Sequence, residues 1–131
     1  TNHGGGGLSW IGTYGLLSRF GEAATEGMAI MASHGFPPLV VSRPMRGGHF
    51  GVLRFITTFD KKVPTDVEAV RAVNRDLLAA VTERGFIMYK TPVWAWKDLE
   101  GRIDPGMRDL MGRVKRAMDP EGLFNPGKLG T

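Results

Sequence analysis

Four cationic side chains stand close together in a stretch that otherwise suits a protein core. Arg43, Arg46, His49 and Arg54 fall within residues 39–59, LVVSRPMRGGHFGVLRFITTF, where Val, Ile, Phe and Thr predominate. Charged groups are rarely buried without a partner. The pattern therefore predicts that one face of this region meets an anionic partner or solvent. Arginines that point from an outer strand into solvent are the alternative interpretation.

Metal and thiol chemistry are not expected. The three histidines, at positions 3, 34 and 49, have no spacing typical of metal ligands, and the chain contains no cysteine. Without cysteine there is neither a disulfide nor a thiolate metal site, which fits a reducing compartment. We therefore expect no metal and a cytoplasmic location.

The composition is that of an ordinary globular protein. The 131 residues are 42% hydrophobic and 23% charged, so we expect a single domain, residues 1–131, with one core. The net charge is +4 and no basic block exceeds two residues, which favours an anionic partner over nucleic acid. No apolar run approaches the roughly 20 residues that cross a bilayer, so no membrane span is predicted.

The cationic stretch itself is predicted to be a β-hairpin. Its two β-branched and aromatic runs are joined by Arg46-Gly47-Gly48-His49, and glycine reaches the positive φ angles that tight turns need. Residues 8–14 and 86–90 are predicted to be two further strands. The hairpin and these two runs together supply four strands.

Two helices are predicted between the strands. Small and apolar residues recur at helical spacing through residues 19–33, and Gly35 ends that helix. The second helix opens with Thr65 and Glu68, which have the spacing of a capping box, and ends at residues 84–85.

The predicted order is strand, helix, strand, strand, helix, strand. This is the ferredoxin-like βαββαβ arrangement of the α+β class, an antiparallel sheet with helices on one face and the other face open for binding. A third helix is capped by Asp104, with Pro105 in its first turn. Its apolar stripe is expected to pack against another element and consists of Met107, Leu110, Met111, Val114 and Met118.

The most specific segment is the last one, Asp119–Lys128, which reads DPEGLFNPGK and is a loop by its two prolines and two glycines. Following a helix that ends in VKRAM, it resembles the closing signature of the FAD-linked oxidases of the vanillyl-alcohol oxidase and 4-cresol methylhydroxylase type. MRGGHF before an apolar strand and MYKTP after the second helix are also similar to the cap domain of that family. The resemblance extends over nearly the whole chain.

The resemblance implies that the chain is the substrate-binding or cap part of a flavoenzyme. In this family, hydride passes from a substrate C–H to FAD, and protein groups mainly position and polarise the substrate. Family members carry a larger FAD-binding domain ahead of this region, so we expect a separate FAD-binding polypeptide to hold the FAD. The open sheet face is expected to cover the flavin ring. The electron acceptor could be oxygen, a cytochrome or an iron–sulfur protein.

The resemblance also assigns candidate catalytic residues. Tyr89-Lys90 falls where phenol-oxidising members have Tyr-Arg, whose side chains hold the substrate phenolate. Lysine keeps the charge but loses the bidentate fork, so a phenol and a hydroxy acid are both open as anionic substrates. His49 aligns with a histidine of the family's active-site strand, whereas strand alternation directs Arg54 to the opposite side.

Arg43 is the second anion-binding candidate. The structural alternatives are a solvated strand end for Lys90, a structural turn histidine for His49 and a surface ion pair for Arg43.

Trp10, Asn125 and Lys128 are the candidates for contact with FAD. Asn125 and Lys128 lie in the closing loop, which in the family runs close to the flavin domain; a C-terminal clasp is the alternative. Some members link FAD through a histidine just before the first cap strand. Here Gly7 occupies the comparable position, and His3 lies too far into the leader, so we expect non-covalent FAD.

Two functions of other classes stay open. A basic ferredoxin-like domain could be a ligand-binding or RNA-binding module, although Phe50, Phe55 and Phe59 occur without the aromatic and basic motif of RNA binders. A purely structural subunit is the other alternative.

Overall fold

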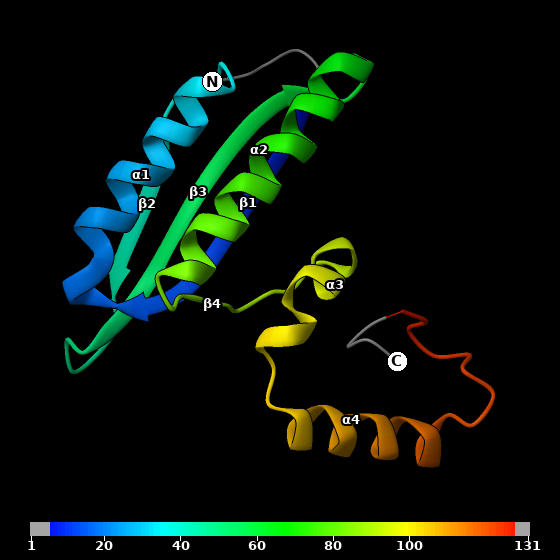
Figure 1. The fold of residues 1–131 in the computed structure, drawn as a ribbon. Helices are drawn as coiled ribbons and strands as arrows, with labels where there is room; N and C mark the ends of the chain where they lie inside the picture. The colour runs from blue at the N-terminus through cyan, green and yellow to red at the C-terminus, as the bar shows by residue number, and fades with distance from the viewer. Residues whose placement is uncertain (1–5, 128–131) are drawn as a thin grey trace. The chain divides into compact units, whose positions relative to one another are not determined.

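The computed structural model describes residues 6–127, which form two compact units divided between Lys90 and Thr91 (Figure 1). The assignment of residues 1–131 to a single domain stays a prediction. Within the described residues, no helix is both long and apolar enough to cross a membrane. The same residues contain no group of histidines and carboxylates suited to hold a metal ion.

The first unit has the predicted α+β fold. Its sheet has the strand order β2-β3-β1-β4, which is the order of a ferredoxin-like βαββαβ domain. The elements in chain order are β1 (Gly6–Leu16), a 3-10 turn (Leu17–Arg19), α1 (Phe20–Ser33), β2 (Leu39–Pro44), β3 (Phe50–Asp60), α2 (Pro64–Glu83) and β4 (Ile87–Met88).

Two long antiparallel strands form the centre of this sheet. β1 pairs with β3 along its whole length, from Gly6 opposite Asp60 to Leu16 opposite Phe50. β2 extends the sheet on the far side of β3, and β4 adds one short pairing beside β1. The β2–β3 turn is the predicted one, since Gly47 and Gly48 have φ angles of +96° and +69°.

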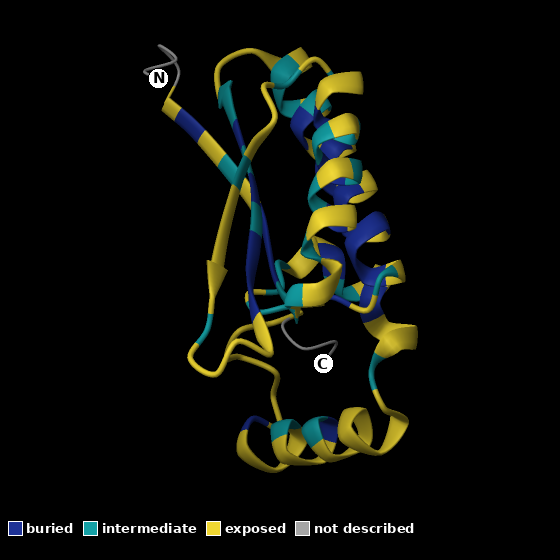
Figure 2. Ribbon diagram, turned by 90° about the vertical axis from the view of Figure 1, so that its left-hand side faces the viewer, coloured by how far each residue is buried: buried dark blue, intermediate teal, exposed yellow. Residues whose placement is uncertain are grey.

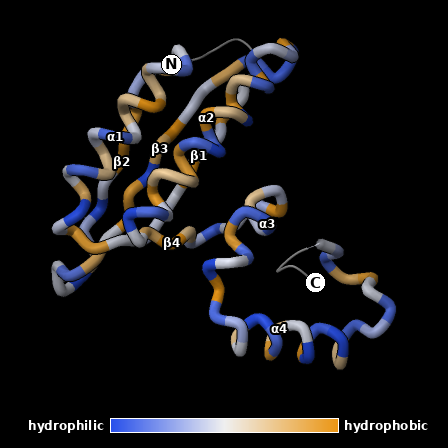
Figure 3. Tube along the Cα trace, in the orientation of Figure 1, coloured by the Kyte–Doolittle hydropathy of each residue, from blue (hydrophilic) through white to orange (hydrophobic). Residues whose placement is uncertain are grey.

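The core lies between the sheet and helices α1 and α2, which cover one face of it (Figure 2). Apolar residues concentrate on β3 and on the inner side of α2 (Figure 3). Gly27 is required in α1 because a Cβ atom there would overlap the ring of Phe55. The fully buried apolar members of the core are Ile11, Met31, Leu53, Phe55, Val73, Leu77, Val81 and Phe86.

Two predicted details of the first unit are wrong. The capping box is absent, because α2 begins at Pro64 and its N-cap residue, Val63, makes no side-chain cap hydrogen bond. Proline is well suited to the first helical position, so the helix starts before Thr65 can act as a cap. The last strand is limited to Ile87–Met88, because Phe86 enters the core rather than the ladder.

The second unit is helical. It comprises a 3-10 turn (Val93–Ala95), α3 (Trp96–Leu99), a further 3-10 turn (Glu100–Arg102) and α4 (Pro105–Met118), followed by the loop at residues 119–127. The predicted cap is confirmed, since the Asp104 carboxylate accepts a hydrogen bond of 3.0 Å from the Met107 amide. The predicted packing of the α4 stripe is not found within the described residues. Four of its members are exposed, namely Met107, Leu110, Val114 and Met118.

Candidate functional site

The sheet face opposite α1 and α2 carries an unusual number of exposed apolar side chains. Within residues 6–127, every large apolar strand residue that is exposed has this orientation by strand register. They are Leu8, Trp10, Leu16, Leu39, Val41, Phe50 and Ile87. We call these residues, with Gly12, Tyr14, Arg54 and Tyr89 between them, the open face. A bare apolar area of this kind marks a binding surface in soluble proteins.

Arg54 lies in the middle of the open face. Its cross-strand neighbours are Gly12 on β1 and Val41 on β2. The side chain is half-buried, and its Nε atom is buried without a hydrogen-bond partner among the described residues. Its guanidinium carbon lies 5.7 Å from the centroid of the Tyr89 ring, a distance at which cation and ring attract each other.

Gly12 provides the space in which the Tyr89 ring lies. A Cβ atom at position 12 would come within 2.6 Å of the ring, closer than non-bonded carbons approach. The Tyr89 amide donates a 3.4 Å hydrogen bond to the Gly12 carbonyl, and the Tyr14 ring lies 5.2 Å from the Tyr89 ring. Contacts on both sides thus fix Tyr89 beside Arg54.

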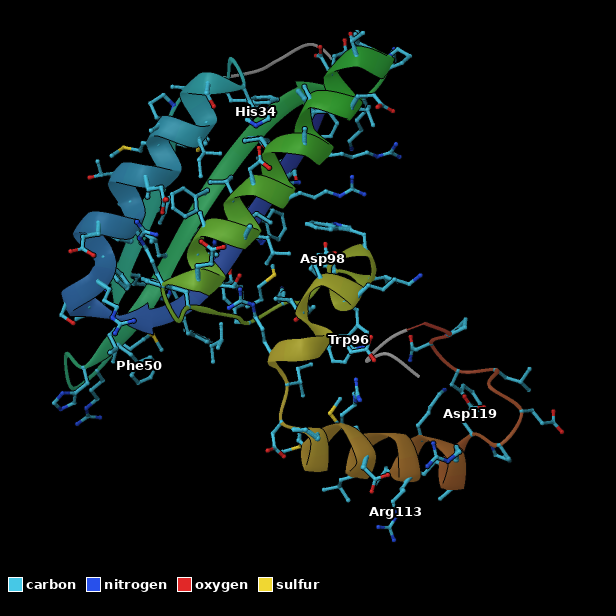
Figure 4. All side chains as sticks on the ribbon, in the orientation of Figure 1. His34, Phe50, Trp96, Asp98, Arg113 and Asp119 are labelled. Carbon is cyan, nitrogen blue, oxygen red and sulfur yellow. The ribbon has the colours of Figure 1, made fainter. Side chains whose placement is uncertain are left out.

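The closing loop of the second unit is organised by a single carboxylate. Asp119 is buried at the end of α4 (Figure 4) and accepts hydrogen bonds from the Leu123 amide at 2.8 Å and the Phe124 amide at 2.9 Å. Lys115, one turn earlier, donates to the same carboxylate and to the Phe124 carbonyl. These contacts fold residues 119–124 back on the helix end.

Asp119 is held in its charged form. The hydrogen bond from the Lys115 ammonium lowers the pKa of Asp119 below its ordinary value of 3.8, which outweighs the opposite effect of burial. The amides of Phe124 and Leu123 lower this pKa further. Beyond the loop start, Asn125 is exposed with a φ of +48°, a left-handed conformation that asparagine tolerates better than most residues.

Comparison with known proteins finds the same resemblance at the end of the chain and a similar fold. Residues 95–129 match the family model described as FAD linked oxidases, C-terminal domain. The fold is also similar to that of p-cresol methylhydroxylase with substrate bound, with a TM-score of 0.80 and 20% identity over 96% of this chain and 24% of that chain. The resemblance to the FAD-linked oxidases is confirmed.

A second solved structure leads to the same conclusion about the fold. The 4-ethylphenol oxidase from Gulosibacter chungangensis, in its isoeugenol complex, has a TM-score of 0.82 and 19% identity over 96% of this chain and 25% of that chain. The chain thus spans about a quarter of the length of these two chains. No curated protein matches the sequence.

The structure places the four predicted catalytic residues unevenly. Tyr89 lies on the open face, and Arg43 has the same orientation, opposite Val52. Lys90 is exposed beyond the end of β4. His49 is exposed in the β2–β3 turn just before β3 begins, so strand alternation does not set its direction. The catalytic roles of all four stay predictions.

The predicted cofactor contacts are also spread over the chain. Trp10 is on the open face and 41% exposed, whereas Asn125 belongs to the closing loop of the other unit. Lys128 and His3 lie outside the described residues. The contacts of Trp10, Asn125 and Lys128 with FAD stay predictions.

Sequence reasoning missed two parts of the open-face site and, in the other unit, the role of the carboxylate that organises the closing loop. Arg54 was grouped with the other hairpin cations and noted as pointing away from His49, but it was not a site candidate, although it is the cation that lies against Tyr89. The role of Gly12 could not be predicted from sequence. A glycine in a strand can be explained only once the side chain that occupies the space beside it, here the Tyr89 ring, is known. Asp119 was visible as part of the signature, and its i, i+4 spacing from Lys115 could have indicated their pairing.

Proposed function

We propose that this chain is the C-terminal part or small subunit of an FAD-dependent oxidoreductase, in which the open face covers the flavin and binds an anionic substrate. The supporting observation is the open face itself, an apolar sheet surface with a half-buried arginine at its centre. The similarity of residues 95–129 to the FAD-linked oxidases agrees with this role. A phenol and a hydroxy acid are both candidate substrates.

The described residues suit the isoalloxazine ring of FAD but not its pyrophosphate. The open face offers aromatic and aliphatic side chains, among them Trp10 and Tyr14, that suit the flat isoalloxazine ring. Between residues 6 and 127, no glycine-rich turn joins a strand to a helix N-terminus in the manner of a pyrophosphate site. We therefore assign the pyrophosphate to an FAD-binding domain or subunit outside residues 6–127, with FAD held non-covalently.

The chain's own residues would bind and orient the substrate. FAD, when bound, supplies the acceptor for a hydride from a substrate C–H. Tyr89 can donate a hydrogen bond to a substrate oxygen, and Lys90, Arg43 and His49 are candidates for balancing its negative charge. Once a flavin covers the open face, its apolar residues would exclude water, which would strengthen the charge interactions there.

A matched pair of substitutions tests whether the open face is the flavin-covering surface. Leu8→Glu places a charge on the open face, while Val63→Glu places the same charge in the turn before α2. Leu8 and Val63 are 54% and 37% exposed, so both substitutions are made at the surface of the chain. The measurements are co-elution with the FAD-binding polypeptide and quenching of flavin fluorescence by iodide.

We expect Leu8→Glu to weaken co-elution and increase iodide quenching, and Val63→Glu to behave like the unmodified chain. The cross-strand neighbour of Leu8 is Thr58, which offers no cation, and burying an unpaired carboxylate in an apolar interface costs several kcal/mol. A Leu8→Glu complex that elutes intact with a protected flavin would contradict the proposal.

A further inference from the structure

Among the lysines and arginines of residues 6–127, Arg54 is the one that is partly buried and has no ion pair. Three lysines or arginines in this range are only partly exposed, namely Arg54, Arg84 and Lys115. Arg84 is 2.6 Å from the Glu26 carboxylate, and Lys115 is paired with Asp119. Arg54 has no ion pair within the same range.

The surroundings of Arg54 attract its charge but leave its hydrogen bonds unused. Tyr89 presents a ring to the guanidinium, and a ring face draws a cation without accepting its N–H bonds as a carboxylate does. The two cross-strand neighbours, Gly12 and Val41, carry no polar side-chain atom. A partly buried cation with unused donors is costly unless an anion completes the site.

We infer that Arg54 binds a carboxylate group of a small ligand at the open face, with Tyr89 held beside it by Gly12. This deepens the proposed function, on which it rests, by naming a substrate class and the residue that selects it. A guanidinium presents a planar fork of N–H donors that matches the two oxygens of a carboxylate, whereas a phenolate offers one oxygen. The geometry favours a carboxylic acid over a phenol.

Benzoate is a suitable probe because it joins a carboxylate to an apolar ring and the open face offers both kinds of contact. The chain is labelled with ¹⁵N in complex with its FAD-binding polypeptide, and the Nε–Hε signal of Arg54 is followed during titration. That signal is assigned by its absence from Arg54→Gln. Benzyl alcohol serves as the uncharged comparison, and 4-nitrophenolate as the phenolate comparison.

We expect benzoate to shift the Arg54 signal and to bind about 10- to 100-fold more weakly to Arg54→Gln, the range for a lost charge-assisted hydrogen bond. Arg54→Lys, which keeps the charge and loses the fork, should lie between the two. Arg75→Gln, an exposed arginine on α2, is the matched control and should bind benzoate normally. Thermal melting checks that each variant is folded.

Two results would overturn the inference. One is unchanged benzoate affinity in folded Arg54→Gln, and the other is tighter binding of 4-nitrophenolate than of benzoate. Failure of the proposed function gives a different pattern, in which no flavin complex forms. In that case the same titration of the 131-residue chain by itself still reports whether Arg54 binds benzoate.

Discussion

The two faces of one sheet serve different purposes, and neighbouring residues of β3 show the contrast. Phe55 points to the helices and is fully buried, whereas Arg54 and Ile56 on either side point to the open face and are half-buried. The helix-covered face forms its core within the chain, since buried side chains of α1 and α2 pack against those of the sheet. Among residues 6–127, the open face leaves apolar area exposed and Arg54 without an ion pair. Under the proposed function, folding and binding thus depend on alternate residues of a single strand.

The largest expected effect is on stability, and it should differ between substitutions on the two faces of the sheet. Phe55→Ala empties the centre of the core and should lower the free energy of unfolding by about 3–5 kcal/mol. Ile56→Ala, the next residue on the other face, should cost less than about half as much, because its side chain already meets solvent. Urea unfolding of both variants measures the difference. Equal losses would mean that the open face also serves as core.

The next largest effect concerns the position of Tyr89 and should alter catalysis more than folding. Gly12→Ala adds a methyl group where the Tyr89 ring lies, so the ring must move. A displacement of about 1 Å in a reacting site can cost roughly 100-fold in rate. We expect kcat of the flavin complex to fall by about that factor.

Gly21→Ala is the control for this substitution, because a methyl group at that position meets no atom within 4 Å. In a Tyr89→Leu background, Gly12→Ala should have no further effect on kcat, since no ring remains to be displaced. If Gly12→Ala and Gly21→Ala are equally active, the contact between Gly12 and Tyr89 has no role in catalysis.

A smaller and more local effect is expected in the closing loop, which completes its own hydrogen bonds. The folded-state pKa of Asp119 is below the ordinary 3.8, so its stabilising effect is present above that pH and is lost as pH falls through the folded value. The Leu123 and Phe124 amides should therefore lose hydrogen-exchange protection in acid below about pH 4.

Asp119→Asn should show that loss of protection already at neutral pH, because the charge that Lys115 binds is gone. Asp109→Asn removes an exposed carboxylate on α4 that lies 3.8 Å from Arg113 and should leave the loop protected. Full protection of the two amides in Asp119→Asn would show that the loop is held by other contacts.

The smallest effect is expected for a substitution at Lys90. Its size shows whether Lys90 or Arg54 is the main anion-binding residue. Lys90→Met keeps the length of the side chain and removes its charge. Because Lys90 is exposed, its loss should lower kcat/KM by about tenfold or less, in line with the roughly 1 kcal/mol of an exposed charge pair. A loss of about 100-fold or more, with benzoate affinity reduced as well, would make Lys90 the main anion-binding residue.

The order and type of the elements could be predicted from sequence because each is set by local chemistry. Gly35 and Gly85 end their helices at φ angles of +78° and +77°, as the periodicity before them indicates. Asp104 caps α4 because its short carboxylate can accept a hydrogen bond from an amide of the first turn, which Pro105 opens. One error came where packing overrides local preference, since Phe86 leaves the last strand to fill the core. The other was local, because Pro64 begins α2 before Thr65 can act as a cap.

The candidate site was less predictable because it depends on pairs that are distant in sequence. Tyr89 was found through its family motif, but nothing in the sequence links it to Arg54 or to Gly12. The direction of Arg54 follows from strand parity only when the register with β1 is known, and that register joins residues as far apart as Gly6 and Asp60. Asp119 illustrates the opposite case, since all of its partners lie within residues 115–124.

The strand order has a consequence for the time course of folding. The β2–β3 hairpin can close early, because its strands are neighbours in sequence, whereas β1 and β4 are separated from it by a helix each. We expect the hairpin to place Arg54 before β4 adds Tyr89. The contact between Arg54 and Tyr89 forms only when this last strand docks. If Arg54 binds an anion as proposed, the complete site therefore depends on the last strand of the domain to be synthesised.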